Sequence, residues 1–231
     1  MTNENEFTGA DILLKALKDQ EVDTIFGYPG GAVLPIYDAI FGQNFLKHVL
    51  VRQEAGAVHA AEGYARSSGK VGVLLVTSGP GVTNVVTGLT DALMDSIPIV
   101  CISGQVPSHL IGTDAFQECD TTGITRPCTK HNYLVKDVSK LSETIHEAFK
   151  IASSGRPGPV LIDIPKDVQF AKSKYISKKD ISFREHRIKA GSKKVDKNFV
   201  EELVNHIKKS ERPIFYVGGG CLNSGHQASQ E

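Results

Sequence analysis

The sequence predicts an α/β protein in which a mostly parallel sheet carries helices on both faces. Helical and strand-like segments alternate along the first 180 residues, as in parallel sheets whose strands are joined by crossover helices. Several strand-like segments are apolar throughout, which indicates strands buried on both faces. Turns rich in glycine and proline follow two of them, at 29–31 and 78–81. Ligands of parallel sheets bind at the carboxyl ends of the strands, so we expect a site at these turns.

The individual elements follow from local patterns. Ile12, Leu13, Ala16 and Leu17 recur at helical spacing, and the apolar run at 24–28 predicts a strand that ends at the first glycine turn. Further helices are expected at 33–41, 54–67, 82–94 and 139–153, and further strands at 48–51, 71–77, 97–103 and 159–164.

A second, smaller unit is expected after the domain formed by residues 1–180. The stretch from 166 to 197 is rich in lysine and arginine and lacks periodicity. It suits a basic patch for a polyanion or a solvated linker; we favour a linker, over 181–197. Residues 198–231 then show one helical pattern and one strand-like run at 213–217. Since so small a unit cannot bury a core, we expect 198–231 to be the truncated start of a second, Rossmann-like α/β domain.

Composition and charge argue against several classes of protein. The formal net charge is zero, which disfavours nucleic acid or an anionic membrane as the main partner. The first residues are polar and acidic and contain no secretory signal, and the apolar runs are too short to span a bilayer. The four cysteines form no CxxC pair and have no metal-ligand spacing with the eight histidines. We therefore expect reduced thiols, a cytoplasmic location and no metal ligands in this chain.

Glu54 is the first candidate for chemistry. It opens a helix built largely of small apolar residues. A carboxylate at this position could simply complement the helix dipole. Small neighbours would also let a flat ligand approach, and an apolar setting would raise the pKa of the carboxyl group. The residues alone leave both interpretations open.

Two glycine-rich turns are further candidates. Gly79-Pro80-Gly81 lies between a strand and a helix, an arrangement that can cradle a phosphate. It lacks the Lys-Ser/Thr of a P-loop and the third glycine of a dinucleotide fingerprint. The Gly218–Gly220 turn also follows a strand-like run and misses the last glycine of that fingerprint, so a plain turn explains it equally well. Spacing alone supports only an α/β domain with a ligand at the strand ends.

Short motifs along nearly the whole chain carry a family resemblance. They are the helix opened by Glu54 and the segments 26–32, 77–84, 104–107, 111–118, 129–133, 155–160 and 216–220. Together they resemble the thiamine-diphosphate-dependent decarboxylases and carboligases, and among these the acetohydroxyacid synthases. The stretches Gly-Thr-Asp-Ala-Phe-Gln-Glu at 112–118 and Lys-His-Asn-Tyr at 130–133 distinguish this synthase from its relatives. The resemblance makes residues 1–180 a pyrimidine-binding domain and 198–231 the start of a central, FAD-associated domain.

The resemblance also implies roles for individual residues. Glu54 would hydrogen-bond N1′ of the cofactor's aminopyrimidine, Gly31 would offer a backbone N–H near the reacting carbonyl oxygen, and Gln117 would orient the substrate. The other implied contacts are Tyr28, Pro29, Gly30, Pro80, Asn84 and Ser96, together with Gln117, for thiamine diphosphate; Arg156, Gly218, Gly219 and Gly220 for FAD; and Pro107, Ala115, Phe116, Lys130 and Lys166 for the substrate channel.

The implied activity is that of acetolactate synthase. Two pyruvates, or pyruvate and 2-ketobutyrate, would condense with loss of CO₂ in branched-chain amino-acid biosynthesis. Mg²⁺ would be held by a third domain that this sequence does not contain, so the isolated fragment is expected to be inactive. A homodimer or homotetramer, a regulatory small subunit and a cytoplasmic or plastid-stroma location would follow. Another thiamine-diphosphate-dependent 2-keto-acid decarboxylase, oxidase or carboligase, or a non-catalytic docking module, remains an alternative.

Overall fold

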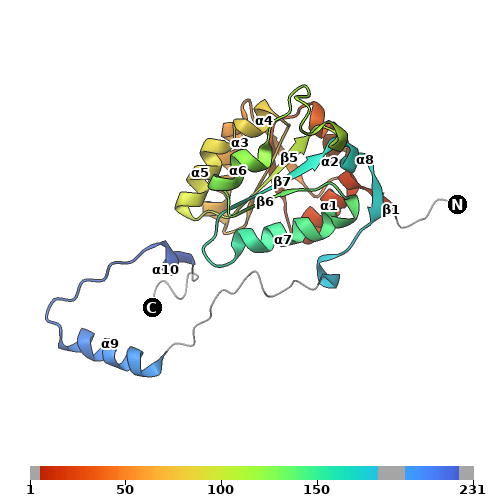
Figure 1. Ribbon diagram of the computed structural model, residues 1–231. Helices are drawn as coiled ribbons and strands as arrows, with labels where there is room; N and C mark the ends of the chain where they lie inside the picture. The colour runs from red at the N-terminus through yellow and green to blue at the C-terminus, as the bar shows by residue number, and fades with distance from the viewer. Residues whose placement is uncertain (1–5, 182–195, 224–231) are drawn as a thin grey trace. The chain divides into compact units, whose positions relative to one another are not determined.

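The computed structural model describes residues 6–181 and 196–223 (Figure 1). The chain divides into two compact units, Met1–Ile188 and Lys189–Glu231. The expected linker at 181–197 lies almost wholly outside the described residues, so the domain limits at 180 and 198 stay predictions.

Six parallel strands form the central sheet of the first unit, in the order β3-β2-β4-β5-β7-β6. A separate antiparallel pair joins β1 to β8, residue Glu6 facing Lys174. The strand bounds are β1 Glu6–Thr8, β2 Thr24–Gly27, β3 Lys47–Leu50, β4 Gly72–Val76, β5 Ile99–Gln105, β6 His131–Leu134, β7 Pro159–Pro165 and β8 Lys172–Lys174.

Helices cover both faces of this sheet, which confirms the expected fold class (Figure 1). On one face lie α1 (Gly9–Asp19), α2 (Leu34–Phe41), α7 (Leu141–Ser153) and α8 (Lys166–Phe170); on the other lie α3 (Glu54–Ser68), α4 (Pro80–Thr83), α5 (Val86–Asp95) and α6 (Thr121–Thr125).

Strand β4 shows why the central strands are apolar throughout. Val73 and Leu75 pack into the core beneath α1 and α7, whereas Leu74 and Val76 pack into the core beneath α3 and α5. Because neighbouring side chains of a strand point to opposite faces, a strand between two layers of helices needs apolar residues at every position.

One expected helix of the first unit needs correction, and three of its strands were not expected. The helix expected at 82–94 is two helices, α4 and α5, separated at Asn84 and Val85. Strand β6 was not expected, because its half-buried His-Asn-Tyr-Leu sequence at the sheet edge lacks a continuous apolar run. Strands β1 and β8 have three residues each, too few for any periodicity to appear.

The second unit contains the expected helix, α9 (Lys197–Lys209), whose N-terminus is capped by the Asp196 side chain. The expected strand at 213–217 is not formed: this segment is irregular, and Ile214 and Tyr216 are almost fully exposed. A strand is stable only when a neighbouring strand binds its backbone, and the described residues of this unit provide none. The short helix α10 (Gly219–Asn223) begins within the glycine turn.

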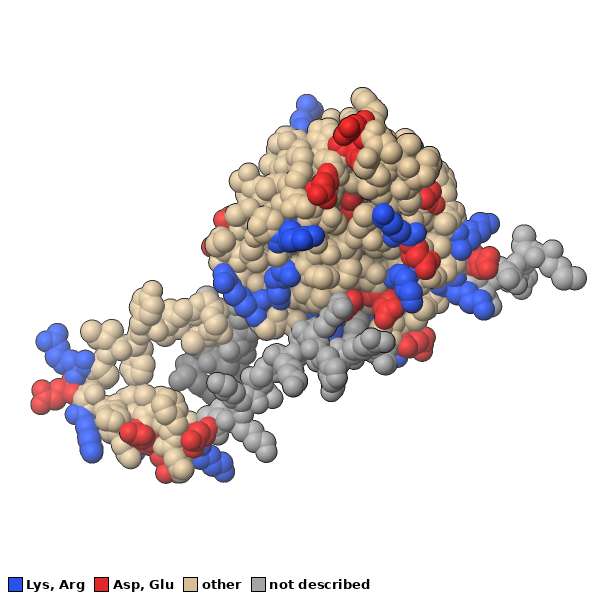
Figure 2. All heavy atoms as spheres, in the orientation of Figure 1, with Lys and Arg blue, Asp and Glu red and all other residues tan. Residues whose placement is uncertain are grey.

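Surface charge agrees with the neutral composition. On the face of the first unit that Figure 2 shows, basic and acidic side chains are interspersed. Among the described residues, no helix is both long enough and apolar enough to cross a membrane.

Candidate active site at the carboxyl edge of the sheet

The carboxyl ends of the parallel strands bring distant parts of the sequence together. The first glycine turn follows β2, Glu54 opens α3 shortly after β3, and Thr77–Gly81 follows β4. The segment from Val106 to Asp120 follows β5 at the same edge. Because these strands are all parallel, the segments that leave their ends meet at one edge of the sheet.

Glu54 is buried at this edge with an oriented carboxylate. Its side chain is 8% exposed, and Asn84 Nδ2 donates to Oε2 over 2.8 Å. The other oxygen, Oε1, faces Gly81, where a Cβ atom would lie 3.6 Å away. One oxygen is therefore held by the Asn84 amide, while the other faces the backbone of Gly81.

Gly30 and Gly81 allow the two glycine-rich turns to pack directly against Thr77. A Cβ at Gly30 would lie 2.5 Å from the Cβ of Thr77, and a Cβ at Gly81 would lie 2.7 Å from Thr77 Cγ2. The Thr77 hydroxyl also accepts a hydrogen bond from the Ala32 N–H, at 3.3 Å. A Cβ at Gly31, in contrast, would meet open space. The backbone at Gly31 is thus accessible beside two turns that pack closely on Thr77.

Gln117 approaches the same turns through its backbone. Its carbonyl oxygen would lie 2.5 Å from a Cβ at Gly79. Both residues have left-handed backbone conformations, with φ of 57° at Gly79 and 58° at Gln117. The Gln117 side chain is exposed, so it is available to a ligand at this edge.

Most of the expected substrate-channel residues also lie in segments that follow the carboxyl ends of strands of the sheet. Pro107, Ala115 and the 87% exposed Phe116 lie after β5, and Lys166 directly follows β7. A hydrogen bond of 2.9 Å from the Ser108 N–H to Asp167 Oδ1 joins the two segments.

Lys130 does not join these residues. It directly precedes β6, at the amino edge of the sheet, and its ammonium donates to the carbonyl oxygens of Ile151 and Ser154. Burial lowers the pKa of Lys130. The side chain binds carbonyl groups left free at the C-terminal end of α7, so this structure assigns it a capping role away from the proposed channel.

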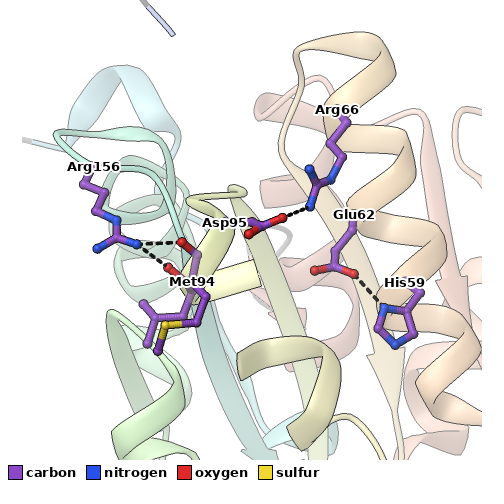
Figure 3. A network of polar contacts seen from close by, with 7 residues as sticks. His59, Glu62, Arg66, Met94, Asp95 and Arg156 are labelled. Carbon is purple, nitrogen blue, oxygen red and sulfur yellow. Dashed lines mark hydrogen bonds and ion pairs between the residues drawn. The ribbon is translucent and has the colours of Figure 1, made fainter. Parts of the chain in front are cut away.

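Ser96 is likewise far from Glu54. It follows the C-terminal end of α5, at the amino edge of the sheet where β5 begins, and its hydroxyl accepts from Arg156 Nε at 2.7 Å. Arg156 also donates to the carbonyl oxygens of Leu93 and Met94, and Figure 3 shows its guanidinium turned toward this helix end. A ten-residue helix such as α5 is about 15 Å long, which separates Ser96 from the glycine turns. The expected contact between Ser96 and the pyrimidine is therefore not supported.

The remaining expected FAD contacts belong to the second unit. Gly218 lies in irregular chain, and Gly219 and Gly220 form the first turn of α10.

Sequence reasoning missed a polar cluster on α3 and α5. His59 Nδ1 lies 2.7 Å from Glu62 Oε2 (Figure 3). Ligand atoms of these two residues and Asp91 lie within 4.8 Å of one another. Burial raises the pKa of Glu62, and its Oε1 atom is buried without a hydrogen-bond partner among the described residues. These groups could hold a cation. The spacing of His59 and Glu62, three residues apart on a helix, was the available signal.

A second missed cluster lies beneath the carboxyl edge. Asp163 is 1% exposed and accepts hydrogen bonds from Ser103 Oγ at 2.7 Å and Gln105 Nε2 at 3.0 Å. Burial raises the pKa of Asp163 to about 7, although these hydrogen bonds oppose the shift. In the sequence, Asp163 is a single acid within an apolar strand, and nothing there indicates its partners.

Residues 7–124 match the thiamine pyrophosphate enzyme family through its N-terminal TPP binding domain, so the chain belongs to this family. Similar proteins include the chloroplastic acetolactate synthase of Arabidopsis thaliana, 52% identical over 94% of this chain and 32% of the relative. The isozyme 3 large subunit of Escherichia coli acetolactate synthase is 48% identical over 97% of this chain and 39% of its own length.

The mitochondrial catalytic subunit of Saccharomyces cerevisiae acetolactate synthase is 50% identical over 94% of this chain and 32% of the relative. These matches confirm the family resemblance seen in the motifs. The chain spans about a third of the length of these relatives, between 32% and 39%.

Proposed function

We propose that this chain forms the pyrimidine-binding part of an acetolactate synthase. The reaction joins two pyruvates, or pyruvate and 2-ketobutyrate, into an acetohydroxy acid and releases one CO₂. The observation that carries the proposal is the buried Glu54 carboxylate. Asn84 binds one of its oxygens, and the other oxygen faces Gly81, which has no side chain. The similarity to acetolactate synthases across nearly the whole chain supports the choice of substrate.

The residues present fit the aminopyrimidine end of thiamine diphosphate. A flat ring needs a donor or acceptor at its edge and no side chains against its face. Glu54 provides the first. Gly31 provides the second, because a Cβ at that position would meet open space. When bound, thiamine diphosphate supplies the electron sink for decarboxylation of the 2-keto acid.

The chain's own residues would orient the reactants and move a proton. Glu54 would share a proton with the ring nitrogen that it contacts, and Asn84 would keep the carboxylate turned toward that nitrogen. The backbone N–H of Gly31 would donate to the substrate's carbonyl oxygen. Gln117, held against Gly79, would place its exposed amide over the substrate.

The further cofactors and partners belong to the same proposal. Mg²⁺ would be held by residues outside this chain. FAD would contact Arg156 and the turn at Gly218–Gly220. A small regulatory subunit is proposed because some relatives are named large subunits. A homodimer or homotetramer is proposed from the family resemblance alone.

Replacement of Glu54 by glutamine tests the proposal directly. In Glu54→Gln the new amide keeps an oxygen for Asn84 to bind, but it cannot share a proton, so turnover of pyruvate should fall by about a hundredfold or more. Glu143→Gln, which changes a carboxylate in the first turn of another helix, α7, is the matched control and should retain activity. Acetolactate should be measured in the protein that carries this chain, with thiamine diphosphate, Mg²⁺ and FAD present.

Three outcomes would contradict the proposal. Near-normal activity of Glu54→Gln would remove Glu54 from the mechanism. Acetaldehyde or acetate as the product would assign the chain to a related decarboxylase or oxidase. No turnover by the unmodified protein would favour a non-catalytic docking module.

A further inference from the structure

A buried polar network lies beneath the segment that carries Gln117. Residues 106–120, here named the 106–120 loop, connect β5 to α6. Gln105 is the last residue of β5, and Asp163 lies on the neighbouring strand β7, opposite Ser103. Asp163 and Gln105 are at most 2% exposed. Neither side chain can therefore touch a ligand at the surface of the site.

The Gln105 side chain binds both ends of the 106–120 loop. Its Oε1 accepts from the Val106 N–H at 2.8 Å, where the loop begins. Its Nε2 donates to the Cys119 carbonyl oxygen at 3.1 Å and lies 3.2 Å from Thr121 Oγ1, where the loop ends. A single amide thus joins two points of the backbone that are 13 residues apart.

Asp163 determines which way this amide faces. Its Oδ2 accepts from Gln105 Nε2 at 3.0 Å, while Ser103 binds its Oδ1. If the amide were flipped, its oxygen would face the Cys119 carbonyl and its NH₂ would face the Val106 N–H, and the hydrogen bond from Gln105 Nε2 to Asp163 Oδ2 would be lost. In a buried site such unpaired groups are costly, so the carboxyl group selects the orientation that closes the loop.

The loop needs this support because its backbone is strained. Asp114 and Gln117 both have a φ of 58°, in the left-handed region that residues with a side chain rarely occupy. The Glu118 carboxylate binds the N–H groups of Gly112 and Ala115 and so folds the middle of the loop on itself. At its far end the loop packs the Gln117 carbonyl against Gly79. Strained conformations persist only where the surrounding contacts determine them.

We propose that Gln105 and Asp163 are positioning residues. Their hydrogen bonds, here named the clasp, join the two ends of the 106–120 loop and thereby hold Gln117 beside the Gly79 turn. Asp163 binds Gln105, and Gln105 binds the carbonyl of Cys119, two residues after Gln117. The Gln117 carbonyl lies against Gly79, in the turn whose Gly81 faces Glu54. The effect on catalysis rests on the proposed function of Gln117, whereas the clasp itself does not.

Hydrogen exchange of the full chain tests the clasp without any activity measurement. In Asp163→Ala and Gln105→Met, amides of the 106–120 loop should exchange about tenfold faster, because loop opening no longer breaks the clasp. Asp163→Asn should behave like the unmodified chain, since its amide can accept from Gln105 and donate to Ser103 Oγ. Ser142→Ala, which removes a buried hydroxyl bound to the Ile176 N–H, is the control for general destabilisation.

The proposal is overturned if the loop exchanges at an unchanged rate in both Asp163→Ala and Gln105→Met. It is also overturned if exchange rises equally in β4 and in the loop, or if Asp163→Asn resembles Asp163→Ala. Gln105→Met keeps the volume of the side chain, so it provides a result even if Asp163→Ala fails to fold.

Kinetics then separate positioning of Gln117 from support of the loop alone. In the acetolactate assay, Asp163→Ala should lower kcat about tenfold at nearly unchanged KM for pyruvate, and Asp163→Asn should restore it. Faster loop exchange with unchanged kcat would contradict the positioning role. Absence of acetolactate from the unmodified protein would reject the proposed function and leave the exchange result on the clasp valid.

Discussion

Asn84 Nδ2 donates a 2.8 Å hydrogen bond to Glu54 Oε2, although the two residues are 30 positions apart. Asn84 ends the short helix α4 after β4, and Glu54 begins α3 after β3. The two strands are not neighbours, since β2 lies between them. The first glycine turn follows β2 and so lies between the segments that follow β3 and β4. The hydrogen bond from Asn84 to Glu54 connects these two segments.

Removal of the Asn84 amide should impair the proposed reaction more than the fold. In Asn84→Ala, Glu54 Oε2 loses its donor and the carboxylate can rotate, so kcat should fall about tenfold. Because the buried Glu54 carboxylate loses a hydrogen bond, the free energy of unfolding should fall by about 1–2 kcal/mol, which leaves the fold intact. Acetolactate assays and urea unfolding measure the two effects, and Thr83→Ala, one residue away, is the control. A loss of stability with unchanged kcat would contradict this role.

Crowding at the second glycine turn should be reversible by a second substitution. Gly81→Ala places a Cβ 2.7 Å from Thr77 Cγ2 and should lower the free energy of unfolding by about 1–3 kcal/mol. Thr77→Ser removes that methyl group and keeps the hydroxyl that accepts from Ala32. The double variant should therefore regain most of the stability in urea unfolding. Additive losses would show that the methyl group is not the obstacle.

Asp163 should make stability depend on pH in a defined direction. Its pKa in the folded chain is raised to about 7, from an ordinary value of 3.8. Between these values the folded chain binds a proton that the unfolded chain has lost, so the contribution of Asp163 to stability decreases as pH rises through this window. The slope is at most about 1.4 kcal/mol per pH unit.

The comparison with Asp163→Asn isolates this effect. The amide of this variant does not titrate. The free energy of unfolding of the variant, measured in urea titrations, should therefore rise relative to that of the unmodified chain as the pH increases from about 5 to about 8. Parallel pH profiles for the two proteins would mean that Asp163 keeps an ordinary pKa.

Arg156 should stabilise the chain independently of any cofactor. Arg156→Ala removes the hydrogen bonds to the Leu93 and Met94 carbonyls at the end of α5 and should cost about 1 kcal/mol in urea unfolding without FAD. Ser96→Ala removes one acceptor and leaves the guanidinium in place, so it should cost less. If Arg156 also contacts FAD, only Arg156→Ala should weaken FAD binding measured by calorimetry. If FAD binding were weakened equally in both variants, the loss would come from the disturbed C-terminal end of α5 and not from a contact between Arg156 and FAD.

Local patterns in the sequence were sufficient for much of the fold. Strand β4 was predictable because burial between two helix layers requires apolar residues at every position, and α3 because Glu54 precedes a continuous helical pattern. The edge strand β6 was not predictable, since a half-buried edge tolerates polar side chains. The strand at 213–217 was predicted wrongly, because an apolar run forms a strand only beside a partner.

By itself, the sequence determined the α/β class, the motifs of the family and the identity of Glu54, Asn84 and Gln117 as candidates. The class follows from the pattern of apolar runs and turns, whereas Asn84 and Gln117 were singled out only by the family resemblance. Only the tertiary structure decided that Ser96 and Lys130 lie at the opposite edge from Glu54, because the length and direction of each helix carry residues across the sheet. It alone also revealed Asp163 beneath Gln105, since a contact between residues 58 positions apart exists only after adjacent strands have paired.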